Sequence, residues 1–243
     1  MKNAVLMDDE RRRMAEFIRQ DRRLNFGDIL ECEECGFIGV SMPPDAAALA
    51  DFYKAYYANS TYEKKQNSKL KRASRRLQRL KNYVSGERFL DVGCNLGFAV
   101  EAAGLSGYSA TGIDIDGDAV CQARQRFPAR VFSNTTVRDL AAQGCKFDLV
   151  YCTEVLEHLA DFRGFVHSLG QVVAKKGVLF LTTPDAGHFR RPRNLMTWAE
   201  VKPPEHLSWF SKPHLRELFE NEGLRVKFRF NWKPGVRMIA IRD

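Results

Sequence analysis

Short apolar runs and helical stretches alternate through the middle of the chain, and this alternation limits the fold more than any other feature of the sequence. Each helical stretch is long enough to carry the chain back across a sheet, as the crossovers between parallel strands must. The pattern therefore predicts an α/β fold with a parallel sheet. Strands are expected at residues 88–92, 109–115, 130–133, 147–152 and 177–183, and helices at 98–105, 118–127 and 161–173.

The end of the chain has a different pattern. A helix is expected at residues 212–222, and two β-like runs follow it at 224–231 and 236–241. Only residues 232–235 join these two runs, which is too short for a crossover connection. The sequence therefore predicts that the last two strands form an antiparallel hairpin.

The part of the chain before residue 86 divides into two regions. Residues 1–44 form a charged extension that carries Cys32-x-x-Cys35 and ends at Pro43-Pro44. Residues 45–85 are expected to form two helical pieces that cover the main domain as a lid, and residues 86–243 are expected to form that domain. Residues 1–13 are charged and lack an apolar stretch, so no secretory signal is expected there.

The charge of the chain is unevenly distributed. The formal net charge is +8, and residues 64–81 carry only basic charges, while Leu70, Ala73, Leu77 and Leu80 recur at helical spacing. This spacing predicts an amphipathic helix with a basic outer face. Such a face has three interpretations: a solvated surface, a patch that attracts a phosphate-bearing substrate, or a nucleic-acid contact.

Composition limits the cell compartment and the class of protein. At 44% hydrophobic residues in 243, the chain can bury a sizeable core. It has no apolar run near the roughly 20 residues that span a bilayer, so no membrane span is expected. Its 6 cysteines are scattered, which favours reduced thiols and a soluble, cytoplasmic protein.

The turn after the first expected strand carries the clearest binding motif. It reads Asp91-Val92-Gly93-Cys94-Asn95-Leu96-Gly97, and Asp114 ends the next strand. A glycine-rich strand-to-helix turn brings the backbone close to a nucleotide, and an acid at the next strand end can bind ribose hydroxyls. The dinucleotide fingerprint needs glycine at 93, 95 and 98, where the chain has Gly93, Asn95 and Phe98. Pyrophosphate binding is therefore disfavoured.

The same turn resembles motif I of class I S-adenosylmethionine-dependent methyltransferases, with Asn95 at the middle glycine position. Asparagine tolerates left-handed backbone better than most residues. Other segments match in the same order along the chain. The family's fourth strand and the loop after it resemble residues 147–150 and 154–158, and its fifth strand resembles residues 177–184. Bacterial small-molecule, sugar and ubiquinone-pathway methyltransferases are the most similar. In these relatives the remaining matches are Phe52-Tyr53 with Tyr56-Tyr57, and Glu205-His206-Leu207 through Phe210-Ser211, Leu215 and Gly223.

The resemblance covers about residues 45–243 and implies a Rossmann-like, seven-stranded, mostly parallel sheet with helices on both faces. It implies S-adenosyl-L-methionine as the cofactor. By position, Asp91, Gly93 and Gly97 would frame its methionine part, Asp114 would bind its ribose and Ile115 would pack on its adenine. Cys94 and Asn95 belong to the same turn, and Cys152 and Thr153 would line the pocket.

Two groups of residues are candidates for proton transfer from the acceptor. Glu154, Glu157 and His158 fall at helical spacing, and they could form a structural loop, a base or the divalent-cation site linked to ubiquinone-pathway relatives. The second pair is Glu205-His206, where similar sugar C-methyltransferases place a base. It could instead close the pocket. We predict His206, Glu205 and His158 as catalytic residues and assign no metal ligand.

Two further features leave alternatives open. Residues 186–202 lie where relatives differ, and His188, Arg190, Arg191 and Arg193 could bind a phosphate or carboxylate or simply be solvated. Cys32 and Cys35 supply half of a four-ligand zinc site, and the first 80 residues contain no other Cys or His.

The sequence thus predicts methyl transfer to a small-molecule or glycan-precursor acceptor, at oxygen. The acceptor is expected to be anionic if the basic residues contact it, and a homodimer stays open. One alternative is a nucleic-acid methyltransferase, but residues 152–155 lack the N/D-P-P-Y/F motif of amino-methylating relatives. The other is a non-catalytic protein that kept the fold and binds the cofactor.

Overall fold

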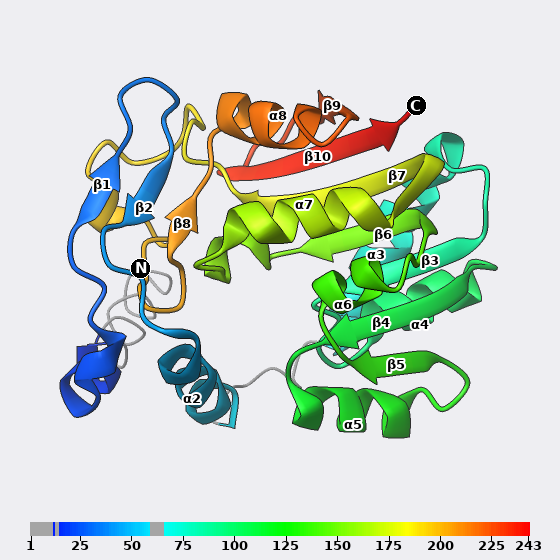
Figure 1. The fold of residues 1–243 in the computed structure, drawn as a ribbon, viewed down its shortest axis with the longest axis horizontal. Coiled ribbons are helices and arrows are strands. Elements are labelled where there is room, and N and C mark those ends of the chain that lie inside the picture. The colour runs from blue at the N-terminus through cyan, green and yellow to red at the C-terminus, as the bar shows by residue number, and fades with distance from the viewer. Residues whose placement is uncertain (1–11, 13–14, 59–65) are drawn as a thin grey trace.

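The computed structural model describes residues 12, 15–58 and 66–243, and its main feature is a seven-stranded sheet (Figure 1). The strand order is β5-β4-β3-β6-β7-β10-β9. In chain order these strands are β3 (Arg88–Val92), β4 (Ser109–Asp114), β5 (Val131–Asn134), β6 (Phe147–Thr153), β7 (Val173–Pro184), β9 (Leu224–Phe228) and β10 (Gly235–Arg242).

Strands β3 to β7 pair in parallel, and β10 runs antiparallel to both β7 and β9. The chain moves from β3 outward to β4 and β5 and then returns to β6 on the other side of β3. The order of strands therefore reverses beside β3, and in open α/β sheets ligands bind outside the carboxyl ends of the strands at such a point.

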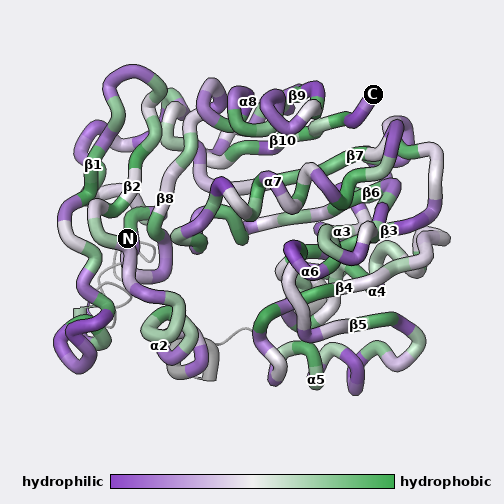
Figure 2. Tube along the Cα trace, viewed as in Figure 1, coloured by the Kyte–Doolittle hydropathy of each residue, from purple (hydrophilic) through white to green (hydrophobic). Residues whose placement is uncertain are grey.

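Helices cover both faces of the sheet and enclose two separate hydrophobic clusters. Figure 2 shows hydrophobic residues along β7 and β10, whereas α7 alternates between hydrophobic and hydrophilic positions. On one face lie α3 (Gln66–Leu80), α4 (Phe98–Leu105) and α5 (Gly117–Arg126), and on the other lie α6 (Val137–Ala142), α7 (Phe162–Val172) and α8 (Lys212–Glu220).

The amphipathic helix predicted from the basic stretch is α3. Ala73, Leu77 and Leu80 are buried against α4 and the sheet, as their spacing predicted. The basic residues at 64 and 65, with the rest of 59–65, lie outside the described residues, as do residues 1–11 and 13–14. The helix α2 (Ala46–Ala58) precedes residues 59–65. The tyrosines at 56 and 57 lie in α2, but their side chains are outside the described part.

The N-terminal extension contains a feature that the sequence did not predict. Strands β1 (Ile29–Glu31) and β2 (Ile38–Val40) form an antiparallel hairpin, and β2 pairs with β8 (Ser208–Trp209) far along the chain. The sequence pattern predicted neither strand in this stretch. Cys32 and Cys35 lie in the turn of the hairpin, whose position against β8 depends on a long-range pairing that no local pattern reports.

No helix in the described part of the chain combines the length and apolar character that crossing a membrane requires.

Candidate functional site

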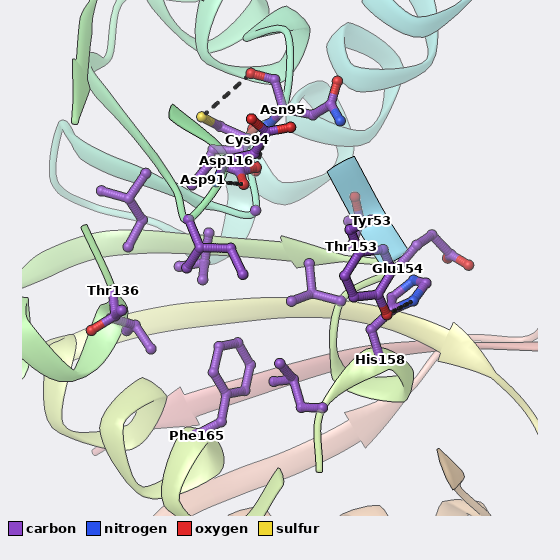
Figure 3. Close-up of a pocket in the computed structure, with 18 of the residues that line it drawn as sticks. Tyr53, Asp91, Cys94, Asn95, Asp116, Thr136, Thr153, Glu154, His158 and Phe165 are labelled. Atoms are coloured by element: carbon purple, nitrogen blue, oxygen red, sulfur yellow. Dashed lines mark hydrogen bonds between the residues drawn. The ribbon is translucent and has the colours of Figure 1, made fainter. Parts of the chain in front are cut away.

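A cleft of about 1070 Å³ opens at the carboxyl ends of β3, β4 and β6 (Figure 3). One wall comes from the strand ends and the loops that follow them, and the other comes from α2 and α3. The volume is at the upper end of the range for ligand sites. The cleft lies beside the point where the strand order reverses, which is where open parallel sheets bind their ligands.

The turn after β3 has the backbone that its sequence predicted. Gly93, Asn95 and Gly97 all have positive φ, at 75°, 46° and 80°. Asn95 thus adopts the left-handed conformation that the family's middle glycine would take. A Cβ at Gly97 would lie 2.6 Å from the Phe132 ring, so this position needs glycine for space as well as for its backbone angle.

Asp114 is held by the same turn. One oxygen of its carboxylate accepts the Asn95 N–H at 2.8 Å, and the other accepts the Asp116 N–H at 3.0 Å. The helix α5 is capped by Asp116, which accepts from the backbone of Asp118 and Ala119. Asp114 is therefore not a helix cap, and it lines the cleft.

Asp91 and Asp114 bring two carboxyl groups to one end of the cleft. Asp91 is only 4% exposed, and burial, together with the charge of Asp114, raises the pKa of Asp91 to about 8. Burial also raises the pKa of Asp114, although hydrogen bonds from the backbone of Asp116 and Asn95 oppose that shift. Two carboxyl groups in such a setting favour a ligand that carries positive charge.

The other predicted cofactor residues fall into two sets. Cys94 and Ile115 line the cleft, and Ile115 is 70% exposed there. Thr153 also lines the cleft, at the end of β6. Cys152 does not: it is fully buried in the cluster under α6, α7 and α8. Successive residues of a strand point to opposite faces, so the prediction that both Cys152 and Thr153 line the pocket is wrong for Cys152.

His158 lies in the cleft wall and is fixed by hydrogen bonds. Its Nδ1 lies 2.7 Å from the backbone carbonyl of Glu205, and the Tyr53 hydroxyl lies 3.2 Å from the same nitrogen. The Tyr53 hydroxyl also donates to the Glu205 carbonyl at 3.0 Å. With Nδ1–H donated to the carbonyl, the Nε2 atom keeps its lone pair. Burial lowers the pKa of His158 to about 4, so the imidazole is neutral at pH 7.

The predicted pair Glu205-His206 lies behind His158, not at the cleft surface. The His206 ring packs edge-to-face on the His158 ring with centroids 4.8 Å apart, and its Nδ1 bonds the Glu200 carbonyl at 2.8 Å. The Glu205 carboxylate pairs with Lys202 at 3.1 Å. Neither His206 nor Glu205 lines the cleft. The sequence predicted that Glu205 and His206 lie in a loop near the pocket. It could not predict that His158, rather than His206, would line the cleft.

Glu157, His158 and His206 form a compact group below the cleft. One ligand atom from each lies within 4.8 Å of the others. Thr183 donates to one Glu157 oxygen at 3.0 Å, and the other oxygen is buried with no hydrogen-bond partner. Burial raises the pKa of Glu157 well above its ordinary value. One carboxylate oxygen and two neutral imidazole nitrogens are a donor set that suits a divalent cation.

The basic residues of α3 contribute a wall that the sequence only partly anticipated. Lys69, Arg72 and Arg76 line the cleft. The Arg76 guanidinium donates to the Tyr151 hydroxyl at 2.9 Å and lies 5.7 Å from the Phe180 ring centroid. Helical spacing predicted a basic outer face, but the contact between one edge of that face and the cleft depends on how α3 packs on the sheet.

Two other predicted features lie away from the cleft. In the loop after β7, His188 is buried and Arg191 pairs with Glu31 at 3.4 Å, and none of its arginines lines the cleft. Cys32 is exposed and Cys35 half-buried. Within the described residues, neither cysteine belongs to a group of three or more metal-ligating side chains.

Comparisons with known proteins agree with this architecture. A family model described as a methyltransferase domain matches residues 62–227. The ubiquinone biosynthesis O-methyltransferase of Glaesserella parasuis is 33% identical over 111 residues, which are 42% of this chain and 47% of that protein. The enzyme of the same name from Cronobacter sakazakii is 29% identical over 182 residues, covering 62% and 71%. The chain spans about half the length of the first relatives that it matches.

Solved structures share the fold at low sequence identity. A SAM-dependent methyltransferase from Archaeoglobus fulgidus has a TM-score of 0.58 at 15% identity, over 71% of this chain and 94% of that one. The magnesium protoporphyrin IX methyltransferase of Synechocystis, solved with bound SAH, has a TM-score of 0.56 at 16% identity and covers 99% and 100%. Since the family model matches more than half of the chain, this protein belongs to the methyltransferase-domain family, as its motifs predicted.

Proposed function

We propose that the protein transfers a methyl group from S-adenosylmethionine to an oxygen atom of a small-molecule or glycan-precursor acceptor. One observation carries this proposal: a cleft at the strand-order reversal joins the Asp91–Asp114 acid pair to His158 and Tyr53. The acid pair would bind the cofactor at one end of the cleft, and His158 and Tyr53 would face the acceptor at the other. The oxygen specificity rests on the ubiquinone biosynthesis O-methyltransferases among the relatives.

The residues at the first end fit the cofactor. Two backbone N–H groups hold the Asp114 carboxylate, which could accept hydrogen bonds from both ribose hydroxyls. Asp91 is mostly protonated at pH 7 without ligand, and a positively charged methionine part beside it would favour its ionised, negatively charged form. Ile115 offers an exposed apolar surface for the adenine. The bound cofactor would supply a methyl group already activated by its sulfonium, so the protein's task is alignment.

The basic wall supports an anionic acceptor. Arg72 and Lys69 lie on the same side of the cleft as Arg76, and Lys54 adds a further cation from α2. The single carboxylate of the cofactor needs only one basic side chain as a partner. The other basic side chains of the wall favour a phosphate or carboxylate on the acceptor.

His158 is the proposed residue that faces the acceptor. Its Nε2 lone pair can accept a hydrogen bond from an acceptor hydroxyl, while Tyr53 and the Glu205 carbonyl hold the ring. Because its pKa is about 4, His158 is a weak base on its own. We therefore propose a positioning role for Glu205 and His206, which support His158 from behind.

A divalent cation held by Glu157, His158 and His206 is the alternative to this direct contact, because the one free lone pair of His158 cannot bind both a cation and the acceptor hydroxyl. The unpartnered Glu157 oxygen and the two neutral imidazoles favour it over an isolated base. A cation held there would lower the pKa of a hydroxyl in the cleft.

The experiment is methyl transfer from methyl-labelled S-adenosylmethionine to a panel of phenols, sugar phosphates, nucleotide sugars and RNA. We expect label on the oxygen of a small acceptor, with faster transfer to anionic members. Label on RNA that is lost with added salt would favour the nucleic-acid alternative. Tight cofactor binding without turnover on any acceptor would favour the non-catalytic alternative.

A further inference from the structure

Three aromatic side chains form an exposed cluster on loops outside the cleft. Phe189 follows β7, and Phe230 and Trp232 lie in the turn between β9 and β10. Their exposed fractions are 69%, 64% and 66%. The Trp232 ring lies 5.0 Å from the Phe230 ring and 6.5 Å from the Phe189 ring, both edge-on. We call Phe189, Phe230 and Trp232 the aromatic patch. A contiguous exposed patch of this kind indicates an interaction surface.

The patch is supported from beneath, so its rings stay exposed. Buried His188 stacks on Phe189 with centroids 4.5 Å apart, and its Nε2 bonds the Asn231 carbonyl at 2.9 Å. Arg190 donates to the Trp232 carbonyl at 3.5 Å. These contacts join the two loops that carry the aromatic patch.

The two loops that carry the patch contain basic residues and no acidic residue of their own. Residues 186–198 and 229–235, which contain it, have no aspartate or glutamate. Arg190, Arg229 and Lys233 are all exposed. Among the described residues, none of these three forms an ion pair. The surface therefore favours a partner that combines negative charge with apolar groups.

The patch lies at the same edge of the sheet as the cleft. Pro184, the last residue of β7, pairs with Gly235, the first residue of β10 (Figure 1). The loops on both sides of this pair hold the patch, beyond the carboxyl ends of the parallel strands. A surface that bound here would therefore face the same side of the molecule as the opening at β3, β4 and β6.

We propose that the aromatic patch and its three cations dock the protein on a bilayer surface that contains anionic lipid. Aromatic rings are favoured at the level of lipid headgroups, and each basic residue near an anionic surface contributes about 1 kcal/mol of attraction. This inference does not depend on which acceptor is methylated.

Two other occupants fit the patch less well. A symmetric pair of copies would bring each patch against itself and oppose Arg190, Arg229 and Lys233 to their own counterparts. Single-stranded nucleic acid stacks bases on open ring faces, whereas the rings of the patch pack edge to face at 70° and 85°.

Tryptophan fluorescence gives a direct test, because Trp198 and Trp209 are buried and Trp232 is exposed. The full chain is titrated with vesicles of phosphatidylglycerol and phosphatidylcholine, and separately with phosphatidylcholine alone. We expect a blue shift of the emission and co-sedimentation with the anionic vesicles only. Lipids brominated in the acyl chains should quench the shifted emission.

Matched variants locate the contact. Lys233→Glu should weaken partitioning to anionic vesicles roughly tenfold, and Trp232→Ala should reduce co-sedimentation similarly. Leu105→Ala and Lys175→Glu change exposed residues at the other edge of the sheet and should leave binding unchanged. The proposal is overturned if the protein does not bind vesicles or if the control variants lose as much binding as the patch variants. It is also overturned if the protein forms concentration-dependent dimers that Trp232→Ala abolishes, or if single-stranded RNA binds the patch more tightly than vesicles do.

Discussion

Asp91 and Asp114 determine the charge at the cofactor end of the cleft. Both carboxyl groups sit at the ends of adjacent strands, at a register where Asp91 pairs with Gly112 and Asp114 with Asn134. Their positions in the sequence predicted this neighbourhood, because parallel strands end at the same edge. The protonation of Asp91 could not be predicted, because it depends on how completely the surrounding chain excludes water.

Asp91 should make stability depend on pH. Its pKa is about 8 when folded against an ordinary 3.8, so its contribution is complete below about pH 4 and is lost as pH rises through 8. The expected loss between pH 5 and 9 is on the order of 2–4 kcal/mol without ligand. Denaturant unfolding across this range should show the slope in the natural protein and a smaller slope in Asp91→Asn. An unchanged slope would contradict the assignment.

His158 and His206 should differ in their effect on turnover. His158 faces the cleft and His206 supports it from behind. With a working acceptor, His158→Ala should lower kcat about a hundredfold and His206→Ala roughly tenfold. His167→Ala serves as the control, because His167 is exposed and pairs with Glu222 on the surface. A larger loss in His206→Ala than in His158→Ala would restore His206 as the residue that faces the acceptor.

The proposed cation site can be removed in two independent ways. Chelation should lower turnover. Glu157→Gln should lower both turnover and bound divalent metal measured by atomic emission, because the amide keeps the volume but cannot ionise to bind a cation as a carboxylate does. The free-cysteine residues Cys32 and Cys35 are outside this group, so Cys32→Ser should leave the metal content unchanged. Full activity in chelator would leave the three side chains with a structural role.

At the scale of elements, the turn between β3 and α4 shows what the sequence could and could not predict. Its strands, helices and positive-φ positions followed from local pattern and from the resemblance. The hairpin of β1 and β2 and the short helix α6 were missed, because three-residue strands and a six-residue helix have little periodicity. Their placement depends on contacts with residues distant in the sequence, such as the pairing of Ile38 with Trp209.

Gly97 provides a test of the tight turn with a matched control. Gly97 and Gly107 both have positive φ, but only at Gly97 would a Cβ collide with a neighbour, at 2.6 Å from the Phe132 ring. Gly107→Ala should cost about 1 kcal/mol from backbone conformation alone. Gly97→Ala should cost roughly 1–3 kcal/mol more, from overpacking. Thermal or denaturant unfolding would measure both, and equal losses would contradict the close packing of the turn.

At the scale of the whole molecule, the alternation of strands and helices predicts the fold. It does not predict which molecule accepts the methyl group. The seven-stranded, mostly parallel sheet and its antiparallel end agree with the prediction. The functional faces come from packing: α3 presents Arg72 and Arg76 to the cleft, and the loops at one sheet edge gather Phe189, Phe230 and Trp232. Neither arrangement has a sequence signature, since each joins segments that are far apart along the chain.

The most direct test is a calorimetric titration with S-adenosylhomocysteine, with Asp114→Ala and the exposed-acid control Glu87→Ala beside the natural protein. We expect binding to the natural protein, at least tenfold weaker binding to Asp114→Ala because two ribose hydrogen bonds are lost, and no change in Glu87→Ala. The absence of binding, or equal affinity for the natural protein and Asp114→Ala, would contradict the assignment of this cleft as the cofactor site.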